Sequence, residues 1–322
     1  MKISIFFSLF FFALQSLIAQ DYSNSVFSSS PLALNPATTG TFGNSNMRVH
    51  TAFNWNKYWG FLHKNIMSIS VDKTLLKGKL GVGGDVSYEF GNDFVKSKGA
   101  MLSAAYNQGF FNNNVKLSVG MQAGLMQNSY DWDQLVFEQI LDPRSGTIYP
   151  GDENLQIKDH VLYPDLNLGM LVFRNTDNSN IMPWIGLTVS HLFRPDVSFL
   201  PVSSTPLARK LTIHAGADIP LDAQIVLMPL LLFTQQEQFK TLDLGGSARY
   251  RLGSFSVSAG GLYKIYWYGN SEQHQKSLLA ELGYAGFELR MELVVLKDRV
   301  DRQSQYSSGT VGLSWNLKGG KK

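Results

Sequence analysis

The sequence contains no cysteine, and this absence removes several kinds of site at once. Disulfide bridges, thiolate metal centres, cysteine nucleophiles and a lipid-modified N-terminal cysteine are all excluded. The charge is also small, since the formal net charge is +3 over 322 residues. We therefore expect no nucleic acid among the partners, because chains that bind nucleic acid usually carry a strong excess of positive charge.

Long apolar runs are absent as well, except at the very start. After residue 20 no stretch approaches the ~18 consecutive apolar residues of a membrane-spanning helix. The chain begins MKISIFFSLFFFALQSLIAQD, in which Lys2 precedes an apolar stretch from Ile3 to Leu14 and small Ala19 precedes a polar segment. This order is typical of a secretory signal peptide. We assign residues 1–19 to it, predict cleavage after Ala19 or Gln20, and expect an exported protein.

What the sequence does contain is alternation with a period of two residues. In KLGVGGDVSYEF, residues 79–90, Leu80, Val82 and Val86 fall on one face of an extended strand, whereas Asp85 and Ser87 fall on the other. Helical periodicity is missing, and glycine interrupts most segments. The alternating pattern predicts strands over residues 46–58, 65–73, 79–90, 98–110, 114–127, 160–173, 181–193, 208–219, 223–234, 239–251, 254–267, 277–285, 286–297 and 308–317.

Two architectures fit such strands. A soluble sandwich buries the apolar faces inside, whereas a membrane barrel turns them outward to lipid. Connections after even-numbered strands are short and most of those after odd-numbered strands are long and polar, and aromatic residues gather near strand ends. Both features are typical of outer-membrane barrels. We predict an all-β fold, a transmembrane antiparallel β-barrel of about 14 strands over residues 46–322, preceded by an irregular segment over residues 20–45. A soluble secreted sandwich remains the alternative fold.

Two features fit a closed barrel less well. Residues 225–233, IVLMPLLLF, are apolar on both faces and include Pro229. Proline cannot donate to a strand ladder, so this position needs a bulge or a lumen face covered by the N-terminal segment. The C-terminus reads LKGGKK and places Trp315 some way from the end.

The region after the signal sequence contains an N-P-A-x-x-G motif, Asn35-Pro36-Ala37-Thr38-Thr39-Gly40, followed by Arg48 and then by the aromatic residues Trp55, Tyr58 and Trp59. This order of elements resembles the PorP/SprF family of type IX secretion system membrane proteins. Further on, Pro164 to Gly169 and Trp184 to Leu192 are similar to the middle of that family. Thr38 stands where the family usually has tyrosine. The resemblance extends from the signal sequence to the last strand and leaves no second domain.

The resemblance implies a non-enzymatic role in the outer membrane. Members of the family assist the secretion and surface attachment of large cargo proteins, including gliding adhesins. The expected partners are a cargo's C-terminal domain, other type IX secretion components and membrane lipid. A passive outer-membrane channel or a transporter of hydrophobic ligands is the alternative function.

The residues themselves show no catalytic or metal-binding pattern. The histidines are isolated, with no ligand spacing among them, and no G-x-S-x-G motif occurs. We predict no enzymatic activity and no cofactor. The long polar connections instead carry large apolar side chains that suit either a docking surface or a cap over the lumen. The candidate partner-binding residues are Tyr130, Trp132, Phe137, Tyr149 and Phe199.

Overall fold

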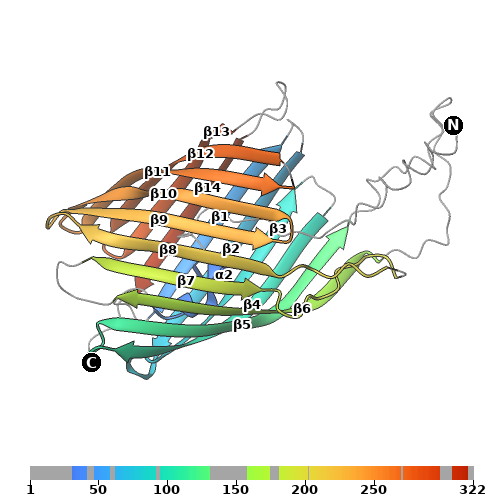
Figure 1. Cartoon of the computed structure of the whole chain (residues 1–322), viewed down its shortest axis with the longest axis horizontal. Helices are drawn as coiled ribbons and strands as arrows, with labels where there is room; N and C mark the ends of the chain where they lie inside the picture. The colour runs from blue at the N-terminus through green and yellow to red at the C-terminus, as the bar shows by residue number, and fades with distance from the viewer. Residues whose placement is uncertain are drawn as a thin grey trace.

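The computed structural model describes residues 31–41, 47–58, 62–91, 95–130, 158–174, 181–201, 203–269, 271–297 and 307–317. Within them, fourteen strands form one closed antiparallel barrel in which each strand pairs with its sequence neighbours and β1 pairs with β14 (Figure 1). The prediction of a β-barrel of about 14 strands is therefore confirmed. The strands are β1 (Met47–Tyr58), β2 (Leu62–Leu75), β3 (Leu80–Gly91), β4 (Val95–Phe110), β5 (Val115–Tyr130), β6 (His160–Arg174), β7 (Met182–Ser190), β8 (Lys210–Pro220), β9 (Ile225–Gln236), β10 (Phe239–Leu252), β11 (Phe255–Tyr268), β12 (Ser271–Tyr284), β13 (Phe287–Lys297) and β14 (Ser307–Leu317).

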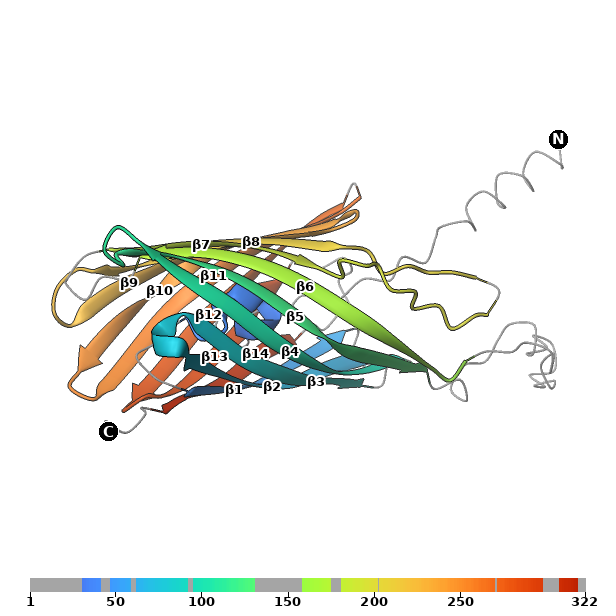
Figure 2. The same cartoon turned by 90° about the horizontal axis from the view of Figure 1, so that it is seen from below.

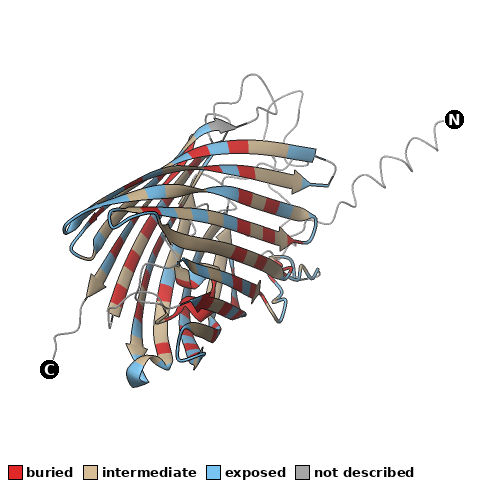
Figure 3. Cartoon of the chain, turned by 60° about the vertical axis from the view of Figure 1, so that its left-hand side comes forward, coloured by how far each residue is buried: buried red, intermediate tan, exposed pale blue. Residues whose placement is uncertain are grey.

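The barrel is apolar outside and polar inside. Along β6, buried and more exposed residues alternate almost without interruption, as the two faces of a strand require (Figure 3). The largest fully buried side chains are mostly polar and include Lys264, His214 and Gln122. Large apolar side chains such as Leu102, at 76% exposure, lie on the outer surface. Within the described residues, no helix has the length and apolarity needed to cross a membrane.

Aromatic side chains mark the two ends of the apolar outer band. At the end with the short turns, the rings of Phe255 and Tyr284 lie against each other in a tilted arrangement with centroids 4.5 Å apart, and Trp315 is 53% exposed. At the opposite end, Tyr88 stacks on Phe90 at 5.3 Å. Amphipathic rings favour the boundary between lipid and water, so these two groups indicate where the hydrocarbon ends. Met47 pairs with Leu317, which places both ends of the barrel sequence at the short-turn, periplasmic end.

The predicted sorting of connections holds for only some of the extracellular links. The links over residues 131–157, 191–209 and 298–306 are long, and the first and last of these are outside the described residues. Glu237 and Gln238 alone join β9 to β10, and residues 269–270 alone join β11 to β12. The prediction of a long polar connection after residue 267 was wrong. Its polar residues continue the β11–β12 ladder, which extends to Tyr268 and Ser271.

Pro229 interrupts the pairing of β8 with β9. Gly216 pairs with Leu230, and the register resumes only where Ile219 pairs with Leu227. Pro229 lacks an N–H to donate, so the local gap in the ladder accommodates it. The register is the same on both sides of this gap, so the ladder lacks the predicted bulge, and the N-terminal segment lies mainly against other strands.

We predict that a charge in the outer band destabilises the barrel according to its depth. Met121 on β5 is 51% exposed and lies near the middle of the apolar band. Met121→Arg should lower the free energy of unfolding by roughly 2–4 kcal/mol, because its guanidinium must enter hydrocarbon. The measurement is denaturant-dependent folding into lipid vesicles. Ser129→Arg, on the same face of β5 and closer to its extracellular end, is the control and should cost only about 0–1 kcal/mol. Equal losses would show that the assigned membrane position is wrong.

A candidate functional site in the barrel lumen

Residues 31–41 lie inside the barrel. They form two short helical turns, α2 (Pro31–Leu34) and η1 (Pro36–Thr38), which Figures 1 and 2 show within the ring of strands. Leu32, Asn35, Ala37 and Thr39 have no measurable exposure. Contacts run mainly to β4, β5 and β6. The barrel wall thus encloses a segment of its own chain, residues 31–41, which we name the luminal segment.

Asn35 fixes the beginning of η1 and ties it to two strands. Its backbone is extended and its Oδ1 accepts from Ala37 N at 2.8 Å, which is helix N-capping with proline at the first helical position. Its Nδ2 donates to Met170 O at 3.0 Å and to His214 Nε2 at 2.8 Å. Because an amide nitrogen only donates, His214 accepts at Nε2 and carries its proton on Nδ1.

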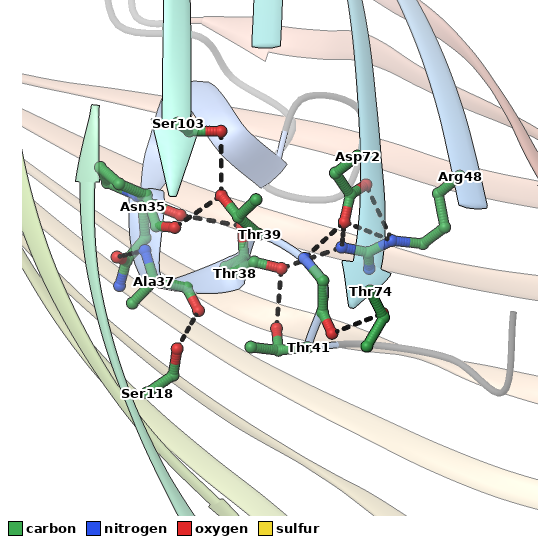
Figure 4. Close-up of polar contacts among 12 residues, drawn as sticks. Asn35, Ala37, Thr38, Thr39, Thr41, Arg48, Asp72, Thr74, Ser103 and Ser118 are labelled. Carbon is green, nitrogen blue, oxygen red and sulfur yellow. Dashed lines mark hydrogen bonds and ion pairs between the residues drawn. The ribbon is translucent and has the colours of Figure 1, made fainter. Parts of the chain in front are cut away.

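A buried ion pair holds the other end of the luminal segment (Figure 4). Arg48 Nη2 lies 2.5 Å from Asp72 Oδ2, and Arg48 Nε donates to Asp72 Oδ1 at 3.0 Å. The same Arg48 Nη2 donates to Thr38 O at 2.9 Å, while Gly40 N donates to Asp72 Oδ2 at 2.6 Å. Paired charges with their remaining sites filled are the form in which buried ions are tolerated. The charged side chains of Arg48 on β1 and Asp72 on β2 therefore both bind the backbone of the segment.

Hydroxyl groups complete the polar attachment. Ser118 Oγ donates to Ala37 O at 2.7 Å, and Thr74 Oγ1 donates to Gly40 O at 3.0 Å. Thr39 Oγ1 contacts Ser103 Oγ at 3.1 Å (Figure 4). Short side chains from three strands thus satisfy backbone carbonyls and a hydroxyl of this buried or partly buried segment.

Glycines on the inner wall leave room for the segment. A Cβ at Gly81 would stand 2.0 Å from Thr39 O, and one at Gly169 would stand 2.0 Å from Asn35 Oδ1. At Gly120 the distance to Ala37 N would be 2.4 Å. These three glycines come from β3, β6 and β5, so the groove is built across neighbouring strands. Its floor is apolar, since Ala37 packs with Leu171, Phe173 and Trp184.

The opposite wall of the lumen is crossed by charged side chains. Glu281 accepts from Arg249 Nη2 at 2.5 Å and from Arg290 Nε at 2.6 Å, and Arg290 Nη2 also reaches Glu288 at 2.6 Å. Lys264 Nζ lies 2.9 Å from Asp243 Oδ2, and both side chains are 2% exposed. The mid-strand charges thus pair across a shared interior. Among the described residues, no group of three His, Cys, Asp or Glu side chains is arranged to hold a metal ion.

The structure places two of the five predicted partner-binding residues. Tyr130 meets Phe199 edge-on with ring centroids 4.4 Å apart, at the extracellular end of β5. Phe199 also packs against a buried cluster of Val161, Tyr163, Val197 and Leu207. Trp132, Phe137 and Tyr149 are outside the described residues. The luminal role of Asn35 and Gly40 was not predicted, although the glycines on successive strands were a usable signal.

Comparison with known proteins agrees with this geometry. The CymD monoaromatic hydrocarbon channel is 12% identical, with a TM-score of 0.53 over 91% of this chain and 94% of that one. The TodX monoaromatic hydrocarbon channel deltaS2 mutant is 13% identical, with a TM-score of 0.52 over 91% and 95%. Such low identity shows a shared fold alone. No curated protein matches the sequence.

The apolar exterior, aromatic ends and polar interior define this chain as an outer-membrane β-barrel. Residues 16–313 match the family described as Type IX secretion system membrane protein PorP/SprF. The chain therefore belongs to the PorP/SprF family, and the resemblance seen in its motifs is confirmed. It is a membrane component of type IX secretion, located in the outer membrane.

We predict that one methyl group in the groove loosens the luminal segment. Gly120→Ala forces a Cβ against the backbone of Pro36 and Ala37. Overpacking costs about 1–3 kcal/mol, so the fraction of molecules in which the segment has left the groove should rise roughly tenfold or more. The chain has no cysteine, so Thr38→Cys supplies a single reporter thiol. Its labelling rate with a water-soluble maleimide is the measurement.

Gly261→Ala is the matched control, because the nearest atom to its Cβ would be Ser277 O at 3.3 Å. Labelling of the Thr38→Cys thiol should keep its original slow rate in that background. A fast rate without any groove substitution would contradict the buried position of the segment.

Proposed function

We propose that this barrel assists the secretion and surface attachment of a large, adhesin-like cargo protein by binding the cargo's C-terminal domain at its extracellular end. In cells that glide, the cargo would be a gliding adhesin. The proposal extends the established family membership, which concerns secretion in general. The observation that supports it best is the aromatic platform formed by Tyr130, Phe199 and their supporting cluster.

This platform projects beyond the neighbouring strands and is joined to them by backbone hydrogen bonds. β5 and β6 extend beyond the end of β7, and their ladder continues through the bond from Tyr130 N to Asp159 O at 3.0 Å (Figure 2). Lys158 N donates to Phe199 O at 3.0 Å and joins the 191–209 connection to this extension. Nearby Phe193 and Leu200 are 76% and 39% exposed. Rigid aromatic groups beside exposed apolar ones are the usual anchors of a protein interface.

The groups that occupy the lumen favour docking of the cargo on the barrel over passage of the cargo through it. The luminal segment fills a groove in the periplasmic half, and Lys264, Gln275 and Glu292 are fully buried in the interior. A folded or extended cargo chain would have to displace these groups. We infer that the cargo crosses the membrane through another component of the type IX system, with which this barrel associates.

We predict that deleting the gene leaves one or a few large surface proteins unsecreted or unattached. Complementation with Tyr130→Ala/Phe199→Ala should restore the barrel but not cargo attachment, because the edge-on aromatic pair is lost. Surface proteins are measured by proteolysis of intact cells and by mass spectrometry of the culture medium. Normal cargo display in the deletion strain would refute the proposed role.

The control for that experiment is an aromatic pair at the opposite end of the barrel. Phe255→Ala/Tyr284→Ala removes the tilted ring pair beside the periplasmic turns. At equal amounts of barrel in the outer membrane, this variant should support cargo attachment fully. Loss in both variants alike would mean that reduced barrel stability, and not the platform, explains the defect.

We also predict low ion conductance in planar bilayers. The luminal segment and the buried side chains around it leave little room for a hydrated ion path, whereas a variant lacking residues 31–41 should conduct several-fold more. The measurement is single-channel current after reconstitution. High conductance of the intact barrel, equal to that of the shortened one, would favour the channel alternative over docking.

A further inference from the structure

The barrel wall has a notch between β6 and β7. β7 pairs with β6 only from Leu168 to Phe173, so the upper half of β6, residues 160–167, has no β7 partner. The chain leaves the wall at His191, whose φ is +56°. His191 N donates to Asn167 Oδ1 at 3.1 Å, and Leu192 N donates to Leu166 O at 3.0 Å. These bonds fix the lower border of the notch.

The 191–209 connection closes the notch from inside and leaves its outer side apolar. Val197 and Leu207, at 6% and 3% exposure, pack with the inward-facing Val161 and Tyr163 of β6. On the outer face of the same half-strand, Leu162 is 60% exposed. Pro164 is also exposed there, and proline without an N–H suits an edge that is not paired. Phe193 follows Leu192 and is 76% exposed.

Two guanidinium groups stand next to this apolar surface. Arg209 Nε donates to Leu192 O at 2.9 Å, which holds its guanidinium beside the residue that precedes Phe193. No ion pair to Arg209 occurs among the described residues. Arg194 directly follows Phe193, is 47% exposed, and lies 4.0 Å from Glu237. Glu237 therefore offsets part of the charge of Arg194, whereas no described carboxylate does so for Arg209.

Asp196, the acidic residue of the 191–209 connection, already accepts hydrogen bonds from its own loop. Asp196 accepts from Thr205 N at 2.8 Å and from Ser198 N at 3.0 Å. These bonds, led by the one from Thr205, lower the pKa of the Asp196 carboxyl group. Its charge is thus engaged by the backbone of its own loop.

We propose that the notch binds lipopolysaccharide through its lipid A part. An acyl chain lies against Leu162 and Phe193, and a lipid A phosphate is held by Arg209 together with Arg194. The notch is at the extracellular end, in the leaflet where lipopolysaccharide is the anionic lipid. Guanidinium groups bind phosphate in forked, charge-assisted geometry, and basic side chains beside apolar membrane surface select anionic lipids.

The test measures lipid A bound to the intact detergent-solubilised barrel by native mass spectrometry. Arg194→Gln/Arg209→Gln should weaken binding of bis-phosphorylated lipid A by roughly tenfold or more, since each interfacial basic residue contributes about 1 kcal/mol. Arg174→Gln/Arg251→Gln, two exposed arginines at the periplasmic ends of β6 and β10, is the matched control and should bind like the wild type. Heat-modifiable gel migration confirms that each barrel is folded.

A second variant tests the proposal by strengthening the site. Glu237→Gln removes the carboxylate near Arg194 and should tighten lipid A binding several-fold. Phosphate-free lipid A should bind about as weakly to the wild type as lipid A does to the double variant. Unchanged binding in Arg194→Gln/Arg209→Gln, equal loss in the control pair, or equal affinity for phosphatidylglycerol would overturn the proposal.

Discussion

The requirement that backbone polar groups be paired within hydrocarbon governs this molecule. Strands that cross a membrane satisfy it only when the sheet closes on itself, as β1 and β14 close this one. Closure then determines which side chains suit each face of a strand, because alternate residues must face lipid and the others must face a confined interior. The apolar residues go outward, and the polar and charged ones gather inside. The interior consequently contains Lys264 and Asp243 at 2% exposure, which would be costly unless they were paired.

A confined polar interior explains the luminal segment. Its backbone carbonyls and amides would be unfavourable in hydrocarbon without hydrogen-bond partners, and the inner wall supplies those partners. Asp72 and Arg48 bind each other and still have capacity left, and the segment takes it up at Gly40 N and Thr38 O. Without the segment, both charges would face an unfilled groove. The wall and the segment therefore stabilise each other through one shared ion pair.

The sequence predicted the strands well because alternation is local information. Leu80, Val82 and Val86 already specify which face of β3 meets lipid, and this assignment needs no knowledge of neighbouring strands. The groove could not be predicted in the same way. Gly81, Gly120 and Gly169 are far apart in the chain, and only the observed register brings them to one surface. The predicted end of the strand at residue 267 was wrong for a related reason. Polar residues that are typical of loops continue a ladder when a partner strand lies beside them, as at Tyr268 and Ser271.

The two ends of the barrel are closed by different means, and the difference bears on function. At the periplasmic half, a segment of eleven residues, 31–41, is held mainly through polar contacts, some to its backbone and some to the side chains of Asn35 and Thr39. At the extracellular half, the 191–209 connection packs apolar side chains such as Val197 and Leu207 onto the inner face of β6. Polar contacts of the first kind can be exchanged for water or another chain, whereas apolar packing of the second kind resists opening. Under the proposed function, a cargo docked at the extracellular end would rest on this apolar packing and not on the polar contacts within the lumen.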